Sequence, residues 1–285
     1  MGRITSKFAF IPPEPSYGRN DPRFHRIMSL SGHEISIQHT NMGSAGGPEG
    51  TGYAGVYAHG NAEDLGINAD VVGEMARVTG LELVAFDYTG YGPGRGEVEP
   101  SESRAYGDIE AVIAYLNDVV GIPDSRIVLI GRSLGSGPTV QAGVNHPEIA
   151  GMALVSPLKS AIRTQLPTTV PGFDIFANIS KIPKVSAPLF ILHGIDDRVV
   201  PYSHGQALAD AAPGLYALES VEDAGHNDLM LVLGTTAYFR LFADFVSALP
   251  ALNTERAERA AAAAADNGGD GGGSSSFFSS SSRRS

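Results

Sequence analysis

The chain has 285 residues, a net charge of −11 and no cysteine. This length suits one large α/β domain or two small ones, with enough residues for a substantial core. The negative charge argues against nucleic-acid partners and against electrostatic docking on anionic membranes. The lack of cysteine excludes disulfides and thiol nucleophiles. No apolar run approaches the ~20 residues of a membrane helix, and we expect a cytoplasmic protein.

Apolar runs typical of strands alternate with helical patterns, which predicts a mostly parallel sheet with crossover helices on both faces. The predicted strands are Glu34–Thr40, Tyr53–Ala58, Leu81–Phe86, Ile127–Ile130, Met152–Val155, Leu189–Leu192 and Tyr216–Val221. The predicted helices are Ala69–Val78, Ser101–Val119, Pro138–Asn145, Ser203–Ala212 and Thr235–Ala248.

The pentapeptide Gly131-Arg132-Ser133-Leu134-Gly135 directly follows one predicted strand. A Gly-x-Ser-x-Gly pattern between a strand and a helix indicates a nucleophile elbow, the sharp turn of α/β-hydrolases that raises a serine above the sheet edge. The pattern alone is weak in a chain with 35 glycines. The order of the residues that follow it strengthens the interpretation.

A serine hydroxyl needs an adjacent base, and the base needs an acid that fixes its tautomer. His226 follows the last predicted strand and is the candidate base. Asp197 follows the strand before it and is the candidate acid, with its neighbour Asp196 as the alternative. The order Ser133, Asp197, His226, with each residue after a strand, is the order that this fold requires.

The charge that develops in acyl transfer needs two backbone N–H donors, which form an oxyanion hole. One belongs to Leu134, the residue after the serine, and the other to the loop after the strand Tyr53–Ala58. In that loop we expect Asn61 to be the donor, with Ala62 as the alternative. We expect His59 to brace the loop structurally.

The candidate substrate-binding residues are Tyr88, Tyr91, Leu158 and Phe173. The two tyrosines lie in a glycine-rich loop and either line the acyl site or cover it. The segment 156–185 interrupts the alternation of strands and helices with prolines and scattered apolar residues. We expect it to form a short lid or acyl-binding wall, and a plain surface connection is the alternative.

The predicted organisation is an N-terminal extension at 1–30, one hydrolase domain at 31–250 and a disordered tail rich in Ala, Gly and Ser at 251–285. A frayed helical extension opens the tail. The eight histidines are scattered without a His-Glu-x-x-His pattern, and the glycine clusters lack the lysine of a phosphate-binding loop. We therefore expect no metal and no cofactor.

Several longer segments contain these motifs or lie elsewhere in the chain, and together they carry a family resemblance. They are Phe8–Tyr17 (FAFIPPEPSY), His59–Gly66 (HGNAEDLG), Asp87–Gly92 (DYTGYG), Gly131–Val140 (GRSLGSGPTV), Ser156–Leu158 (SPL), Phe173-Asp174, Ser203–Gly205 (SHG) and Gly225–Asp228 (GHND). From about Lys7 to Pro250 the chain resembles the α/β-hydrolase domain-containing protein 17 family. The resemblance implies a serine hydrolase that removes palmitate from cysteines of membrane-associated proteins, with Ser133, Asp197 and His226 as its triad.

Animal members of that family begin with a palmitoylated cysteine cluster, and that anchor is impossible in a chain without cysteine. The start Met1-Gly2-Arg3-Ile4-Thr5-Ser6 fits the N-myristoylation pattern, and an accidental glycine after the initiator is the alternative. One myristoyl chain would give only weak, reversible association with membranes.

These interpretations together predict hydrolysis of acyl thioesters or esters through an acyl-serine intermediate, with S-acylated proteins or other acyl esters as partners. The nearest alternative is a carboxylesterase or lipid acyl hydrolase, followed by a serine peptidase of the same fold. A non-catalytic binding protein that keeps the fold is the alternative from a different class.

Overall fold

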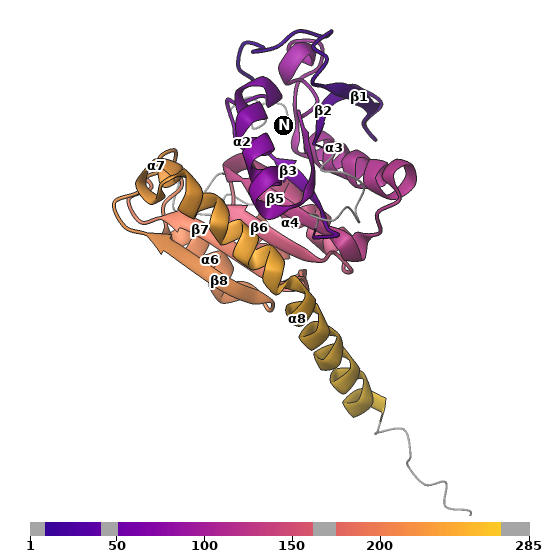
Figure 1. Ribbon diagram of the computed structural model, residues 1–285, viewed down its shortest axis with the longest axis vertical. Coiled ribbons are helices and arrows are strands. Elements are labelled where there is room, and N and C mark those ends of the chain that lie inside the picture. The colour runs from indigo at the N-terminus through magenta and orange to yellow at the C-terminus, as the bar shows by residue number, and fades with distance from the viewer. Residues whose placement is uncertain (1–8, 41–50, 162–174, 269–285) are drawn as a thin grey trace, which may run out of the picture.

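Figure 1 shows a computed structural model of the chain, which describes residues 9–40, 51–161 and 175–268. Three features of the sequence lie outside the described residues: Gly2, the part of the predicted lid that contains Phe173, and the tail beyond residue 268.

A sheet of eight strands forms the centre of the molecule. The strands are β1 (His25–Met28), β2 (Glu34–Thr40), β3 (Ala54–Ala58), β4 (Glu82–Phe86), β5 (Ile127–Arg132), β6 (Gly151–Val155), β7 (Leu189–Gly194) and β8 (Leu215–Val221). Their order across the sheet is β1-β2-β4-β3-β5-β6-β7-β8. β2 runs antiparallel to both of its neighbours, and the other neighbouring pairs are parallel.

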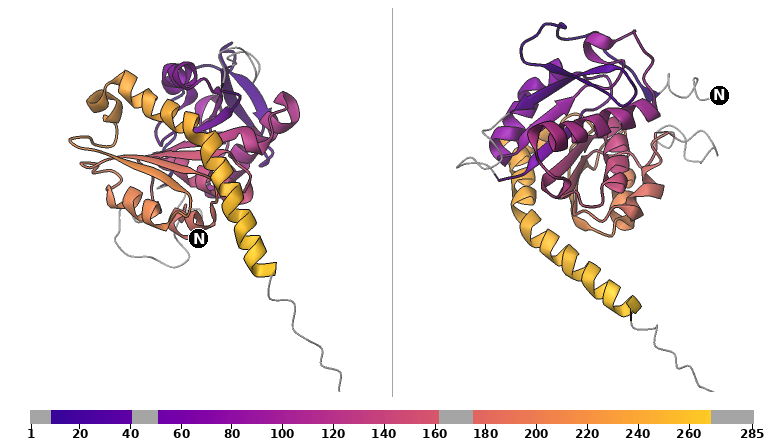
Figure 2. Two further views of the ribbon diagram at one scale, coloured as in Figure 1. Left: turned by 60° about the horizontal axis from the view of Figure 1, so that its bottom comes forward. Right: turned by 90° about the vertical axis from the view of Figure 1, so that its right-hand side faces the viewer.

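Helices cover both faces of this sheet (Figures 1 and 2). The helices are α2 (Leu65–Thr79), α3 (Glu102–Ala114), α4 (Ser136–Asn145), α5 (Asn178–Lys181), α6 (Ser203–Ala211), α7 (Leu229–Leu233) and α8 (Thr235–Gly268). One buried apolar cluster joins the sheet to α3, α4 and α6, and a second joins it to α2 and α8. Because both faces are covered, the central strands are continuous apolar runs rather than alternating ones.

The predicted strands and helices are all present, most of them with shifted ends. The helix expected at Ala69 already begins at Leu65, because the Asp64 side chain caps it by accepting a hydrogen bond of 3.1 Å from the amide of Ile67. The long helix expected at 101–119 ends as α3 at Ala114 and continues as a π-helical segment, Tyr115–Val120. The strand β1 and the short helices α5 and α7 are additional to the predicted elements.

In the C-terminal region α8 continues through residues 251–268, so the helical extension expected at the start of the tail is a continuation of this helix. The helix passes Pro250 and is fastened to the body beyond it. Asn253 Nδ2 donates to Ala150 O at 2.9 Å, and an Arg256 guanidinium nitrogen donates to Ile149 O at 2.8 Å. Residues 260–265 are all alanine, which has the highest helix propensity of any residue type. In Figure 2 the last turns of α8 extend away from the body.

None of the helices in the described ranges combines the length and apolar character that crossing a bilayer would require.

Candidate active site

The chain turns sharply from β5 into α4, and Ser133 lies at that turn. Its φ of +51° is in the left-handed region that side chains rarely adopt. The flanking glycines make the turn sterically possible: a Cβ at Gly131 would lie 2.5 Å from Thr139 Oγ1, and one at Gly135 would overlap backbone oxygens of Ala58 and His59. This strained strand–turn–helix is the elbow that the pentapeptide predicts.

The structure brings Ser133, His226 and Asp197 together at one sheet edge. The Ser133 Oγ lies 2.9 Å from His226 Nε2, and His226 Nδ1 lies 2.7 Å from Asp197 Oδ2. With the proton on Nδ1, the imidazole donates to the carboxylate and accepts from the serine hydroxyl. This continuous relay runs between residues that are far apart in the sequence. It has the geometry in which an imidazole can take a proton from a serine.

Asp197 is buried and held from several sides. Its Oδ1 accepts hydrogen bonds from the amides of Val199 and Val200 at 2.9 and 2.8 Å. Its Oδ2 also lies 3.3 Å from His193 Nε2. Burial alone would raise the pKa of Asp197, but hydrogen bonds from His193, His226 and Val200 outweigh it and lower the pKa far below the ordinary value. The carboxylate therefore stays ionised at neutral pH, whereas Asp196, the alternative acid, is exposed to solvent.

The loop after β3 lies beside the elbow, since Ala58 and Gly131 are register partners in adjacent parallel strands. The amide of Gly60 donates to Glu63 Oε2 at 3.1 Å, and the amide of Ala62 donates to Asn61 Oδ1 at 3.1 Å. Among the described residues, the amide of Asn61 between them has no acceptor. This favours Asn61 over Ala62 as the free donor of the loop.

The predicted second donor, the amide of Leu134, lies in the first turn of the helical segment that begins at Ser133. The first amides of a helix have no acceptor within the helix, so they are available to a developing negative charge.

The side chain of Asn61 holds the N-terminal segment on this loop. Its Oδ1 accepts from the amide of Ile11 at 2.8 Å and from the hydroxyl of Tyr91 at 2.7 Å, and its Nδ2 donates to Ala9 O at 2.8 Å. Phe10 is buried with its ring edge-on to Tyr91. The sequence showed this segment only as part of a family resemblance, without a contact that explains it.

The expected substrate-binding residues are placed differently from one another. Tyr88 is 1% exposed and donates its hydroxyl to His59 O at 2.6 Å, and Tyr91 is 2% exposed with its hydroxyl on Asn61. Both tyrosines are therefore buried and hold the loop of His59 and Asn61 in place, and their role as substrate contacts stays a prediction. Leu158 is buried, with its amide donating to Ser136 Oγ at 3.2 Å beneath the elbow. Phe173 lies outside the described residues.

Arg132 is a residue of the site that the sequence reasoning missed. Its guanidinium forms an ion pair with Glu63 and donates to Asn227 Oδ1 at 2.7 Å. Arg132 thus ties the elbow to the loop of Asn61 on one side and to the loop of His226 on the other. The only sequence signal was its position between glycine and serine, where the pattern allows any residue.

The described part of the chain holds no cluster of three or more His, Asp or Glu side chains that could hold a metal ion. The chemistry that the arrangement offers is that of the serine, the imidazole and the backbone donors.

A serine on a strained turn above a mostly parallel sheet, with this relay behind it, defines the class of α/β-hydrolases. Solved structures agree on the fold. An esterase of Pyrococcus furiosus matches with a TM-score of 0.66 at 17% identity, over 83% of this chain and 98% of the esterase. An alpha-beta serine hydrolase homologue from Coxiella burnetii matches with a TM-score of 0.59 at 18% identity, over 80% of this chain and 99% of that protein. The predicted α/β-hydrolase fold is therefore confirmed.

Sequence comparisons narrow the class. Residues 54–178 match the model of a family described as serine aminopeptidase, S33. The alpha/beta hydrolase domain-containing protein 17C of Xenopus tropicalis is 32% identical over 283 residues, covering 86% of this chain and 89% of the relative. Protein 17B of Homo sapiens is 33% identical over 254 residues, covering 81% and 87%. The chain belongs to the alpha/beta hydrolase domain-containing protein 17 family, as its motifs predicted.

Proposed function

We propose that the protein hydrolyses acyl thioesters and esters through an acyl-serine intermediate, and the observation that carries this proposal is the relay from Ser133 through His226 to Asp197. Ser133 Oγ attacks the acyl carbon while its proton passes to His226 Nε2. The amides of Asn61 and Leu134 stabilise the oxyanion. The leaving thiolate or alkoxide takes the proton from His226. Water then attacks the acyl-serine, with His226 again as the base, and releases the fatty acid.

The substrates that we propose are S-acylated proteins, with long-chain acyl thioesters as the reacting group. The family resemblance suggests this class, and exposed apolar residues in the loops of Asp197 and His226 support it. Ile195 and Val199 flank Asp197 and are 44% and 56% exposed, and Leu231 of α7, shortly after His226, is 83% exposed. Exposed apolar side chains close in sequence to Asp197 and His226 support an apolar substrate or an acylated surface.

Labelling with a fluorophosphonate probe tests the catalytic relay directly. The wild-type protein should be labelled, and Ser133→Ala should abolish labelling while the thermal unfolding temperature stays within a few degrees. A wild-type protein that folds but is not labelled would support the non-catalytic binding protein instead.

A panel of substrates tests the acyl specificity. An S-palmitoyl peptide, a short p-nitrophenyl ester, a phospholipid and an aminoacyl p-nitroanilide should be offered to wild type and Ser133→Ala. We expect Ser133-dependent turnover with the highest kcat/KM for the palmitoyl thioester. Preference for the short ester or the phospholipid would indicate an esterase or lipid acyl hydrolase, and cleavage of the anilide a peptidase.

A further inference from the structure

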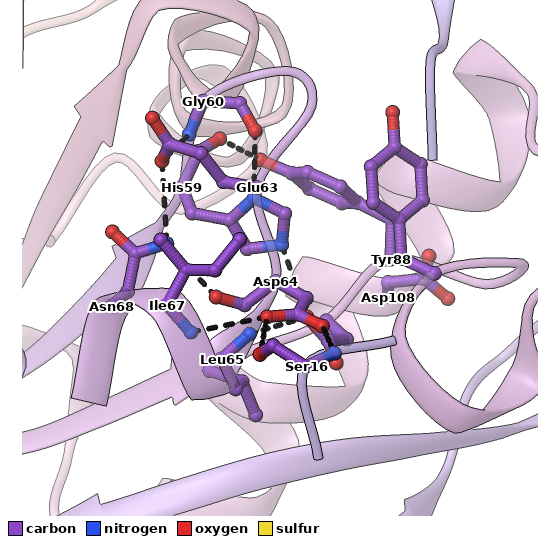
Figure 3. Close-up of polar contacts among 12 residues, drawn as sticks. Ser16, His59, Gly60, Glu63, Asp64, Leu65, Ile67, Asn68, Tyr88 and Asp108 are labelled. Carbon is purple, nitrogen blue, oxygen red and sulfur yellow. Dashed lines mark hydrogen bonds and ion pairs between the residues drawn. The ribbon is translucent and has the colours of Figure 1, made fainter. Parts of the chain in front are cut away.

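His59 is a fully buried histidine at the base of the loop that carries Asn61, and the proposed reaction gives it no chemical step. Figure 3 shows it between Gly60 and Tyr88. Its Nδ1 lies 2.7 Å from Gly60 O, and because a carbonyl oxygen can only accept, Nδ1 carries a proton. The ring also packs against Tyr88 at a centroid distance of 4.5 Å, which restricts its rotation.

The other ring nitrogen of His59 faces a fixed carboxylate. Nε2 lies 3.2 Å from Asp87 Oδ1, at an ion-pair separation without a well-directed hydrogen bond. Asp87 is itself immobilised, since its Oδ1 accepts from the amide of Leu65 at 2.9 Å and its Oδ2 accepts from the hydroxyl of Tyr17. Burial would lower the pKa of His59, but the contacts with Asp87 outweigh it and raise the pKa. Nδ1 carries the proton that Gly60 O accepts, and the carboxylate facing Nε2 favours a proton on that nitrogen as well.

The peptide units of this loop show what the Nδ1 proton does. A trans peptide is planar, so the C=O of one residue and the N–H of the next point in opposite directions within one rigid unit. The unit between His59 and Gly60 is held at both ends, by the Tyr88 hydroxyl on His59 O and by Glu63 on the Gly60 amide.

The unit between Gly60 and Asn61 is held at only one end. Its carbonyl accepts from His59 Nδ1, which turns the N–H of Asn61 away from the ring. Among the described residues this N–H has no acceptor. A donor that is oriented by its own peptide unit but left unpaired is the arrangement expected of an oxyanion-binding amide.

We propose that His59 is a positioning residue for acyl transfer: its Nδ1–H, hydrogen-bonded to Gly60 O, orients the amide of Asn61 toward the oxyanion. This inference rests on the proposed hydrolase function. Asp87 acts one step further away, because its carboxylate lies 3.2 Å from Nε2 and helps to hold the ring in place.

Two substitutions separate this role from simple packing. His59→Asn places an amide nitrogen at the δ position, where it can still donate to Gly60 O. His59→Gln places the nitrogen at the ε position, where it reaches Asp87 but not Gly60 O. Both variants remove the imidazole and have uncharged amide side chains, so each serves as the matched control of the other.

The assay is the hydrolysis of a p-nitrophenyl ester and of its thiono analogue, in which sulfur replaces the carbonyl oxygen and accepts hydrogen bonds poorly. His59→Gln should lower kcat for the oxygen ester by about 10- to 100-fold with little change in KM, because a misdirected donor is lost mainly in the transition state. It should also reduce the preference for oxygen over sulfur. His59→Asn should retain most of the wild-type kcat and most of the preference for oxygen over sulfur.

The proposal is overturned if the two variants lose activity equally, if the loss is in KM, or if the oxygen-to-sulfur preference is unchanged. A wild-type protein that hydrolyses no ester would instead refute the proposed function. If His59→Gln does not fold, nitrogen NMR of the wild-type histidines decides the question. Nδ1 of His59 should be protonated at neutral pH, and an unprotonated Nδ1 would refute the positioning role.

Discussion

Replacing Asp197 by asparagine tests the relay with the smallest change of shape. Asp197 Oδ1 accepts hydrogen bonds from the amides of Val199 and Val200. Only an oxygen can accept these two bonds, so they determine the orientation of an asparagine side chain at this position. In Asp197→Asn the side-chain oxygen would keep accepting from those two amides, so the NH₂ group would face His226 Nδ1. An NH₂ group cannot accept the Nδ1 proton. His226 would adopt the tautomer with its proton on Nε2, directed at Ser133, and could no longer act as a base.

The magnitude follows from the loss of the base in a site that is otherwise intact. We expect kcat for ester hydrolysis to fall by about 10⁴-fold, or about 5 kcal/mol of transition-state stabilisation. Asp196→Asn is the matched control, because it makes the same chemical change at the exposed neighbouring carboxylate. It should remain within about twofold of wild type. The reasoning fails if Asp197→Asn keeps a tenth of the wild-type rate, or if the two variants lose activity alike.

Three further outcomes can be measured. Arg132→Lys should lower kcat/KM by about 10-fold in the ester assay, because an ammonium cannot reproduce the fork that joins Glu63 to Asn227; wild-type activity would contradict this. The two carboxylates around His146, Glu110 foremost, raise its pKa from 6.5 to about 9. The folded pKa is the higher one, so the stabilisation is complete below pH 6.5 and lost as pH rises through about 9. Denaturant titrations should show His146→Gln destabilised by about 1 kcal/mol at pH 6 after allowing for solvent screening, with the difference disappearing near pH 10; a constant difference would point to packing alone. Gly135→Ala should reduce soluble folded protein, since its Cβ would overlap backbone that cannot move aside, and a normal yield with full activity would show that the elbow tolerates more than this geometry allows.

The central strands were predictable from the sequence because burial on both faces leaves a strong local signal. Ile127–Ile130 is a continuous apolar run, and the structure extends it only to Arg132. The edge strand His25–Met28 left no such signal, since its residues are mostly exposed and it exists through its pairing with β2. Elements defined by their partners cannot be found from the local pattern alone.

The placement of Ser133, Asp197 and His226 at one site was predictable because each follows a parallel strand, and parallel strands bring their carboxyl ends to one edge. The contacts that orient the loop of Asn61 were not predictable, since they join residues that are distant in sequence. Asn61 meets Ile11 across 50 positions, and Arg132 meets Asn227 across 95. Tyr88 and Tyr91 show a different limit of prediction from sequence. Their position near the site was foreseeable, but the direction of each hydroxyl was decided by side-chain packing.

Residues 9–17 pack against the loop that carries Asn61 and the start of α2. This N-terminal segment is therefore part of the scaffold of the active site. Ser16 and Tyr17 bind Asp64 and Asp87, the same two carboxylates that cap α2 and face His59. A protease, an antibody or a tether that detaches this segment would therefore disturb the loop that carries Asn61 while leaving the sheet intact. A peptide that competes with this segment for its binding surface would inhibit the enzyme without occupying the substrate site.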